Sequence, residues 1–185
     1  MKKKEEFKDV FNGLSSLWYQ ATAVDLSGSA ITLKPEYDLP VAVDTLALTQ
    51  EEPTINHYKI IGLDGDWCSS STLGNSSFGF TCPTKDTDVL KLAYGADAVN
   101  ADLTATIGSE TYKGHSVKFT KKKVTGTFVL VDEEGINLMV MSNVAVWATP
   151  LYDNPGTAPF AIKFTGTIEG AGRHSMAWLK KQAAA

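Results

Sequence analysis

The stretch that decides the fold is Phe160-Ala161-Ile162-Lys163-Phe164-Thr165-Gly166-Thr167-Ile168-Glu169. Its even-numbered positions carry Phe, Ile, Phe, Gly and Ile, whereas its odd-numbered positions carry Ala, Lys, Thr, Thr and Glu. Successive side chains of a β-strand point to opposite faces, so this pattern predicts a strand with one buried face and one solvated face. Strands of that kind are typical of antiparallel sheets.

The same period of two recurs along the chain from Ala30 onward. It appears at residues 31–34, 45–49, 103–107 and 116–120. Turn-forming residues separate such runs: Asp132-Glu133-Glu134-Gly135 divides residues 127–131 from 136–140, which predicts a hairpin with a loop of about four residues. A longer turn is expected at residues 152–156. The pattern as a whole predicts about nine or ten strands.

Two segments have helical periodicity instead. Residues 86–94 predict a short internal helix, which Asp86 or Thr84 caps and Gly95 ends. Residues 4–18 predict an amphipathic helix, whose apolar stripe is Phe7, Val10, Phe11, Leu14 and Trp18. That stripe has two interpretations: it packs on its own domain, or it docks on a neighbouring subunit. Under the second interpretation Phe7, Val10, Phe11 and Trp18 are inter-subunit contacts.

These elements define one fold class. We expect a mainly β protein, an antiparallel β-sandwich or partly closed barrel with one flanking α-helix and an N-terminal amphipathic helix or arm. The corresponding organisation is an N-terminal arm at residues 1–29, a β-sandwich domain at residues 30–170 and a C-terminal tail at residues 171–185.

Composition and charge limit the function classes. The chain has 185 residues, a formal net charge of −4 and a sequence pI of about 5.4, with 43% hydrophobic and 21% charged residues. Mild acidity argues against tight binding of nucleic acid phosphates. Lys2 to Lys4 are followed by charged residues rather than an apolar run, so we expect no secretory signal and folding in a cytoplasm. The most apolar stretch, residues 136–148, is too short to span a bilayer.

The residues that usually carry chemistry form no catalytic, cofactor or metal motif. His57, His115 and His174 lie at no metal-ligand spacing from one another. If the chain turns about Asn75, Cys68 and Cys82 face each other, as a disulfide, as half a zinc site or as two free thiols. A reducing cytoplasm favours the free thiols. We therefore predict no enzyme activity and no cofactor.

Two charged motifs have ordinary structural interpretations. Asp64-Gly65-Asp66 has the spacing that begins some calcium loops, but the rest of that motif is missing, so it predicts a turn. Lys121-Lys122-Lys123 predicts a solvated loop, and the alternative is a contact with DNA or with an acidic surface of a neighbouring copy.

The order of the features resembles a known family. Thr49-Gln50-Glu51-Glu52-Pro53-Thr54 precedes a strand at residues 58–61, a long polar segment and the helix at 86–94, and paired strands at 126–131, 138–146 and 160–168 end the pattern. This order resembles the major tail tube protein of long-tailed (siphovirus-type) bacteriophages, over about Ala30 to Glu169. Residues 1–29, the tail around Trp178 and the C-terminal immunoglobulin-like domain of some members have no match.

The resemblance implies a structural virion protein. Members of the family have a β-sandwich with one flanking helix, and their hexameric rings stack into a hollow tube through which DNA passes at infection. It implies assembly in the host cytoplasm into the virion tail, with copies of the same chain and other tail proteins as partners and DNA only as cargo.

The polar segment from Asp64 to Pro83 lies where the family has a long loop or hairpin. We expect it to reach the adjacent ring, through Leu73, Gly74, Asn75, Ser76 and Ser77. The competing interpretations are another virion ring protein of the tail terminator type, or a carbohydrate- or receptor-binding β-sandwich whose four tryptophans supply a stacking platform.

Overall fold

The computed structural model describes residues 10–153, 156–170, 172 and 174–182, and it is mainly antiparallel β. The strands are β1 (Ser16–Gln20), β2 (Tyr37–Leu39), β3 (Ala47–Gln50), β4 (Thr54–Tyr58), β5 (Cys68–Thr72), β6 (Ser76–Cys82), β7 (Val99–Ile107), β8 (Glu110–Val117), β9 (Lys123–Val131), β10 (Asn137–Leu151), β11 (Ala161–Ile168) and β12 (Met176–Lys180). The helices are α1 (Thr87–Tyr94) and a 3-10 turn, η2 (Ala96–Ala98).

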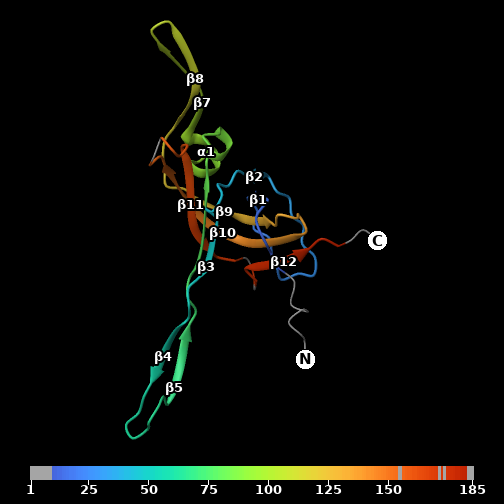
Figure 1. Ribbon diagram of the computed structural model, residues 1–185, viewed down its shortest axis with the longest axis vertical. Coiled ribbons are helices and arrows are strands. Elements are labelled where there is room, and N and C mark those ends of the chain that lie inside the picture. Colours follow the sequence, from blue (N-terminus) through green and yellow to red (C-terminus); the bar gives the residue numbers. More distant parts are fainter. Residues whose placement is uncertain (1–9, 154–155, 171, 173, 183–185) are drawn as a thin grey trace.

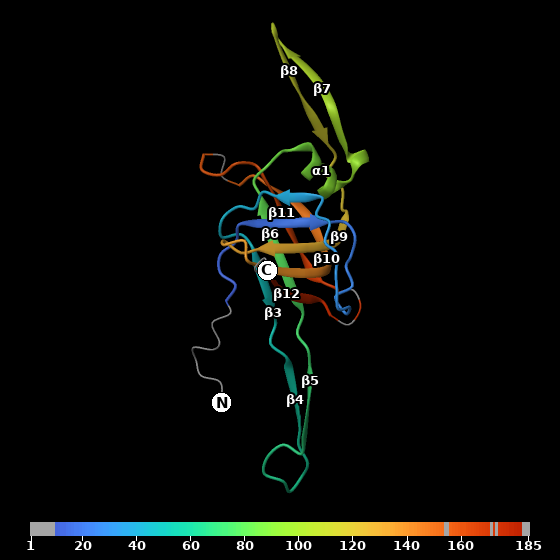
Figure 2. The same cartoon turned by 90° about the vertical axis from the view of Figure 1, so that its right-hand side faces the viewer.

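Eight strands form one sheet, in the order β2-β1-β9-β10-β11-β6-β3, with β12 paired to β10. The 15-residue strand β10 organises it, because β12 pairs with its first half and β11 with its second half, both along the edge opposite β9. The two halves of the sheet cross one another (Figure 2), so it folds over itself into an open sandwich. The predicted fold class is confirmed.

A β-bulge at Ser142 and Asn143 makes this fold possible. The β9–β10 register shifts between Met141 and Val144, and Asn143 adopts a φ of 49°. The Asn143 side chain donates to the carbonyl of Gly170 at 2.9 Å, which fixes the connection from β11 to β12 at the bulge. The bulge therefore bends β10 where its pairing partner changes.

The core lies between the crossed halves. Its centre is aromatic: Phe80 stacks on Phe164 with ring centroids 4.9 Å apart, and Phe78 and Phe128 pack against Phe80. Helix α1 covers one end of this core with Val89 and Leu90, in addition to Ala93 and Tyr94. Asp86 caps the helix, since its side chain accepts from the backbone of Asp88, and Gly95 ends it. The predicted internal helix is confirmed.

The N-terminal helix is wrong where the structure describes it. Residues 16–20 form strand β1, which pairs with β9 through Leu17 opposite Leu130 and Tyr19 opposite Phe128. Leu17 and Tyr19 are buried in the core, whereas Trp18 faces the other side of the sheet, against a small cluster of Leu26, Val129 and Val140. The alternation overrides the helical spacing because β9 supplies backbone partners and aromatic residues favour strands. Phe7 lies outside the described residues.

Two further expectations are corrected. The alternating residues Ile31 and Leu33 form no strand, and instead pack from a loop onto the cluster of Leu26, Val129 and Val140. The described chain has twelve strands rather than nine or ten, because the short strands β1, β2 and β12 were not recognised from the alternation of apolar residues.

The hairpin between β9 and β10 has the predicted turn, and Asp132 holds it. Asp132 is buried, and its carboxylate accepts hydrogen bonds from the backbone of Ile136 at 2.8 Å and from the side chain of Asn137 at 2.5 Å. Gly135 adopts a φ of 67°. Burial raises the pKa of a carboxyl, but the hydrogen bonds from Asn137 and Ile136 outweigh burial and lower the pKa of Asp132 below its ordinary value.

A pH-dependent contribution to stability follows. A carboxyl with a lowered folded pKa stabilises the fold above its unfolded pKa of about 3.9, and this stabilisation is lost as the pH falls through the folded pKa. We expect Asp132→Asn to melt at a lower temperature than the wild type at neutral pH, with the gap narrowing below about pH 4. Thermal melts across that range check this, with Glu134→Gln on the same exposed turn as the control. A gap that is independent of pH would contradict the role of the carboxylate.

Candidate assembly surfaces

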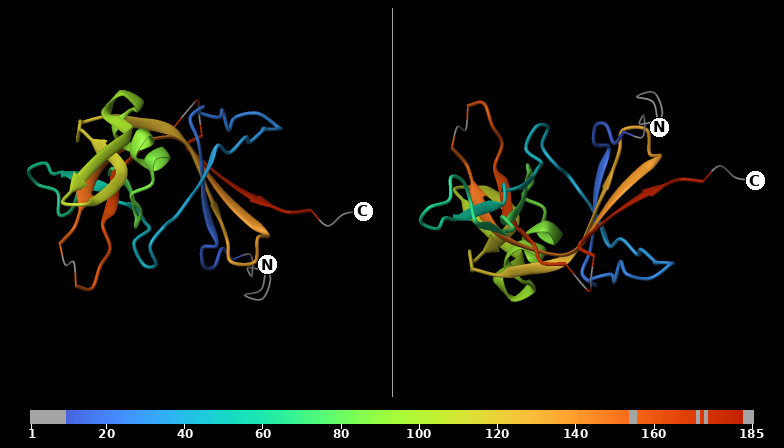
Figure 3. Two further views of the ribbon diagram at one scale, coloured as in Figure 1. Left: turned by 90° about the horizontal axis from the view of Figure 1, so that it is seen from above. Right: turned by 90° about the horizontal axis from the view of Figure 1, so that it is seen from below.

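Two β-hairpins extend from the body in opposite directions along the long axis of the molecule (Figure 1). We call residues 51–75 the β4–β5 arm and residues 99–117 the β7–β8 arm. Seen along that axis, both arms lie on the side of the body away from the red strand β12 (Figure 3). Each arm is a two-stranded sheet separate from the main sheet.

The β4–β5 arm continues strands of the body without a break in register. Gln50 lies opposite Ser76 in the β3–β6 pair and, four residues further along each strand, Thr54 lies opposite Thr72 in the β4–β5 pair. The arm and its root are therefore one long hairpin. Its turn spans residues 59–67, which include the predicted turn at Asp64-Gly65-Asp66.

The turn expected about Asn75 is therefore wrong, and so is the facing pair of cysteines. Cys68 begins β5 and Cys82 ends β6, on successive strands of one side of the hairpin, and both thiols are free. Cys68 is exposed, whereas Cys82 is buried and lies opposite Ile162 of β11. The local Ser, Asn and Gly content around residue 75 signals the joint between body and arm rather than a reversal of the chain.

The two thiols should differ sharply in reactivity. Burial raises the pKa of Cys82 to about 12, and thiolate is the reactive form. We expect one equivalent of thiol to react rapidly with Ellman's reagent near pH 8 in the native protein, and the second only in denaturant. Cys68→Ser should remove the fast equivalent, and Cys82→Ser should leave it. Two fast equivalents in the native protein would contradict the burial of Cys82.

The joint of the β4–β5 arm contains the residues predicted to contact the adjacent ring. The backbone N–H of Glu51 donates to the carbonyl of Asn75 at 3.0 Å, and Thr49 and Ser77 pair through their hydroxyls at 2.5 Å. A Cβ on Gly74 would lie 2.4 Å from the carbonyl oxygen of Glu51, so the close approach at the joint requires glycine. Leu73 is 77% exposed.

The tip of the β4–β5 arm is apolar and exposed. Ile60, Ile61, Leu63 and Trp67 all stand in solvent, and Ile61 is fully exposed. At the base of the tip His57 contacts the carboxylate of Asp66. Clustered apolar side chains at the end of an arm mark an interaction surface more often than a free one.

The β7–β8 arm has the alternation that predicts a buried face, but within this chain that face is exposed. Ala105 lies opposite Tyr112, and Leu103 and Ile107 share the same face. Leu103, Ile107 and Tyr112 are 43%, 69% and 55% exposed. The opposite face is polar, with Thr104 and Thr106. The sequence specifies an apolar face that no described part of the subunit covers.

Two grooves lie at the two ends of the body. The joint groove, of about 540 Å³, lies at the root of the β4–β5 arm and is lined by Leu48, Thr49, Gln50, Leu73, Gly74, Asn75, Ser76, Thr167, Ile168, Ser175 and Met176. The helix-end groove, of about 260 Å³, has a mostly apolar lining of Ala42, Thr45, Thr81, Pro83, Leu151, Asp153, Ala158, Pro159 and Ala161. Four of the residues predicted to contact an adjacent ring line the joint groove.

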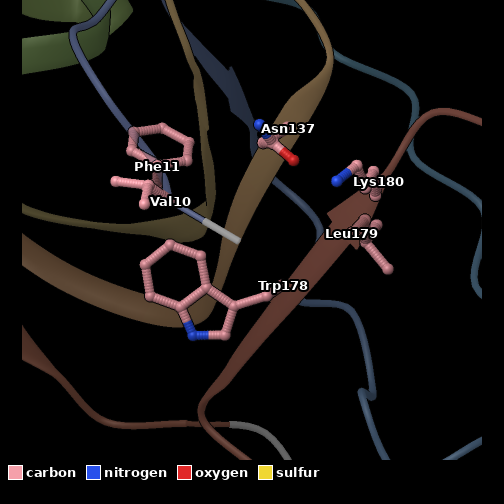
Figure 4. Close-up of a pocket in the computed structure, with 6 residues that line it drawn as sticks. All are labelled: Val10, Phe11, Asn137, Trp178, Leu179 and Lys180. Carbon is pink, nitrogen blue, oxygen red and sulfur yellow. The ribbon is translucent and has the colours of Figure 1, made fainter. Parts of the chain in front are cut away.

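The described part of the N-terminal segment packs on its own subunit. Phe11 meets Trp178 of β12 edge-to-face, with ring centroids 5.7 Å apart, and Val10 beside it is 64% exposed (Figure 4). These residues and Asn137 line a pocket of about 140 Å³. The contact of Phe11 and the contact of Trp18 with Val129 and Val140 agree with the interpretation that the stripe packs on its own domain. An inter-subunit role for Phe7, Val10, Phe11 and Trp18 stays a prediction.

The basic run at residues 121–123 is only partly solvated. Lys122 donates to the carbonyl of Leu92 at 3.0 Å, near the C-terminal end of α1, where a cation is favourable. Lys123 pairs with Glu169 at 2.7 Å, and Lys121 is exposed. Among the residues that the structure describes, no group of three or more His, Cys, Asp or Glu side chains is arranged to hold a metal ion.

No protein-family model matches the chain, and none of the curated proteins compared with it matches either. In the described part of the chain, no helix has the length and apolar character needed to span a membrane.

Proposed function

We propose that this chain is a structural subunit that assembles with copies of itself into stacked rings, as the major tail tube protein of a long-tailed bacteriophage does. The two arms carry this proposal. A lone two-stranded hairpin is only marginally stable in water, and the apolar side chains of Leu103, Ile107 and Tyr112 on the β7–β8 arm are exposed in the single subunit. Neighbouring copies supply a covering surface for every subunit at once.

The edges of the sheets support the same proposal. Strand β3 ends the order of the main sheet, and each arm has two outer edges without a strand partner among the described residues. Unpaired edges promote uncontrolled association unless they are paired, covered or charged. Pairing between subunits into a closed wall removes the edges, and the resulting assembly has a defined diameter.

The charge of the chain suits a conduit for DNA. The formal net charge is −4, and of the three clustered lysines, Lys122 and Lys123 are already held by groups of the same subunit. A wall with free cations would bind phosphates and slow the passage of DNA. The proposed partners are therefore copies of this chain and other tail proteins, with DNA as cargo.

The test is self-assembly of the purified protein. Light scattering at rising concentration, with negative-stain microscopy of the same samples, should reveal rings or tubes of uniform diameter. A monomer that persists at every concentration and on ageing would overturn the proposal.

A further inference from the structure

The apolar tip of the β4–β5 arm and the helix-end groove lie at opposite ends of the subunit. Strand β6 runs from Ser76 at the joint to Cys82, which lies opposite Ile162. Ala161 and Leu151, which face each other across β11 and β10, are therefore at the end of the sheet farthest from the arm. Helix α1 follows five residues after Cys82 and lies at that same end (Figure 1).

One subunit cannot bring its own tip to its own groove, because the body of the molecule separates them. We propose that the tip of the β4–β5 arm docks in the helix-end groove of a second copy of this chain. This inference rests on the proposed self-assembly and names its longitudinal contact. The two surfaces differ, so the contact is head-to-tail and repeats without limit along the axis.

The tip and the groove both present apolar side chains. The tip presents Ile60, Ile61, Leu63 and Trp67, and the groove presents Pro83, Leu151, Ala158, Pro159 and Ala161. Charges of both signs flank the tip, at Lys59 and Asp64, whereas Asp153 lines the groove and Lys85 follows two residues after Pro83 of its lining. All four charged residues are exposed, so opposite charges are available to pair at the rim of the contact.

The second arm fits the same arrangement. The β7–β8 arm leaves the body at the helix end, so a β4–β5 arm arriving at the groove lies alongside it (Figure 1). The eight residues from Glu51 to Tyr58 span about 27 Å of extended chain before the turn, and the nine residues from Val99 to Ile107 span about 30 Å. Arms of comparable length that overlap side by side place the β7–β8 tip near the joint groove of the arriving copy, and cover Leu103 and Tyr112.

The test introduces one glutamate on each of the two surfaces and, as a control, one glutamate on an unrelated loop. Ile61→Glu blocks the tip, Ala158→Glu blocks the groove, and Thr32→Glu adds the same charge to an exposed loop of the body. All three side chains are fully or largely in solvent, so the melting temperatures should match the wild type. Burial of one isoleucine corresponds to about tenfold to hundredfold in an association constant, and a buried charge adds to the loss.

We expect Ile61→Glu and Ala158→Glu each to form single rings that do not stack, at concentrations where the wild type and Thr32→Glu form stacked rings. Sedimentation velocity and negative-stain microscopy measure this. When the two separately prepared variants are mixed, the intact tip of one meets the intact groove of the other. The mixture should form two-layer particles that grow no further, because both remaining surfaces are blocked.

Each alternative outcome is decisive. If both variants stack as the wild type does, or if both fail but their mixture gives no two-layer particles, the docking is wrong while self-assembly stands. If the wild type itself never assembles, the docking and the proposed function both fall.

Discussion

Replacing Gly166 with alanine is expected to destabilise the subunit severely. A Cβ at this position would lie 1.8 Å from the carbonyl oxygen of Ala145, on the neighbouring strand β10. Backbone atoms cannot move aside as a flexible side chain can, so the β10–β11 pair must separate near Val146, which lies opposite Gly166. We expect a loss of about 3 kcal/mol or more in the free energy of unfolding, a large share of an ordinary total of 5–15 kcal/mol.

Gly114→Ala is the matched control. Gly114 lies on strand β8 of the β7–β8 arm, and an added Cβ there meets no atom within 4 Å. Alanine also restricts the unfolded chain more than glycine does, so this variant should be neutral or slightly stabilised. Chemical denaturation of both variants measures the difference. Equal stability of the two would contradict the close approach of β11 to β10.

Gly166 and Gly126 explain how a single sheet bends over itself. Gly126 lies opposite Val144 on the other side of β10, and a Cβ there would lie 2.3 Å from the carbonyl oxygen of Gln20. Gly126 lies beside the bulge at Ser142 and Asn143, and Gly166 lies opposite Val146, three residues further along β10. Glycine inside a strand is typical of such tight bends and close backbone approaches.

Removing the β4–β5 arm is expected to abolish stacking and leave the body intact. Replacing residues 52–74 with Asn-Gly keeps Glu51 opposite Asn75, whose backbone groups are already hydrogen-bonded at 3.0 Å. Asn-Gly favours the two-residue turn that such a pair needs. Every residue that is removed is exposed except Gly74, which is half-buried. The melting temperature should therefore stay within about 2 °C of the wild type.

The stacking contact should weaken by at least about a hundredfold, because the four apolar residues of the tip are lost together. Sedimentation velocity and negative-stain microscopy measure it, and a full-length sample treated identically is the control. A shortened chain that still forms long tubes would exclude the arm from the longitudinal contact. A collapse of its melting temperature would mean that the arm belongs to the fold of the subunit.

The sequence by itself determined the local structure wherever one physical cause was enough. Alternation at residues 160–168 predicts β11 because one face is buried, and Asp86 and Gly95 bound α1 because they satisfy the helix ends. The loop at 132–135 is equally local, since Gly135 takes a positive φ that the turn requires.

Where partners distant in the sequence compete with the local pattern, only the tertiary structure decided which structure a segment adopts. The helical spacing of residues 4–18 is real, but β9 offers Ser16–Gln20 a complete set of backbone partners, and the position of β9 is set by the whole sheet. The polar composition around Asn75 resembles a turn, but one continuous register carries the hairpin past it to residues 59–67. The register depends on every residue pair along the two strands, and a short sequence window contains only one of the two strands.

For the apolar face of the β7–β8 arm, the sequence determines one property and leaves another to the tertiary structure. The alternation at residues 103–107 specifies that this face is to be covered, because apolar side chains are driven out of water wherever they are clustered. It does not specify which chain covers it. The fold places Leu103, Ile107 and Tyr112 beyond the reach of their own core, since the arm extends away from the body.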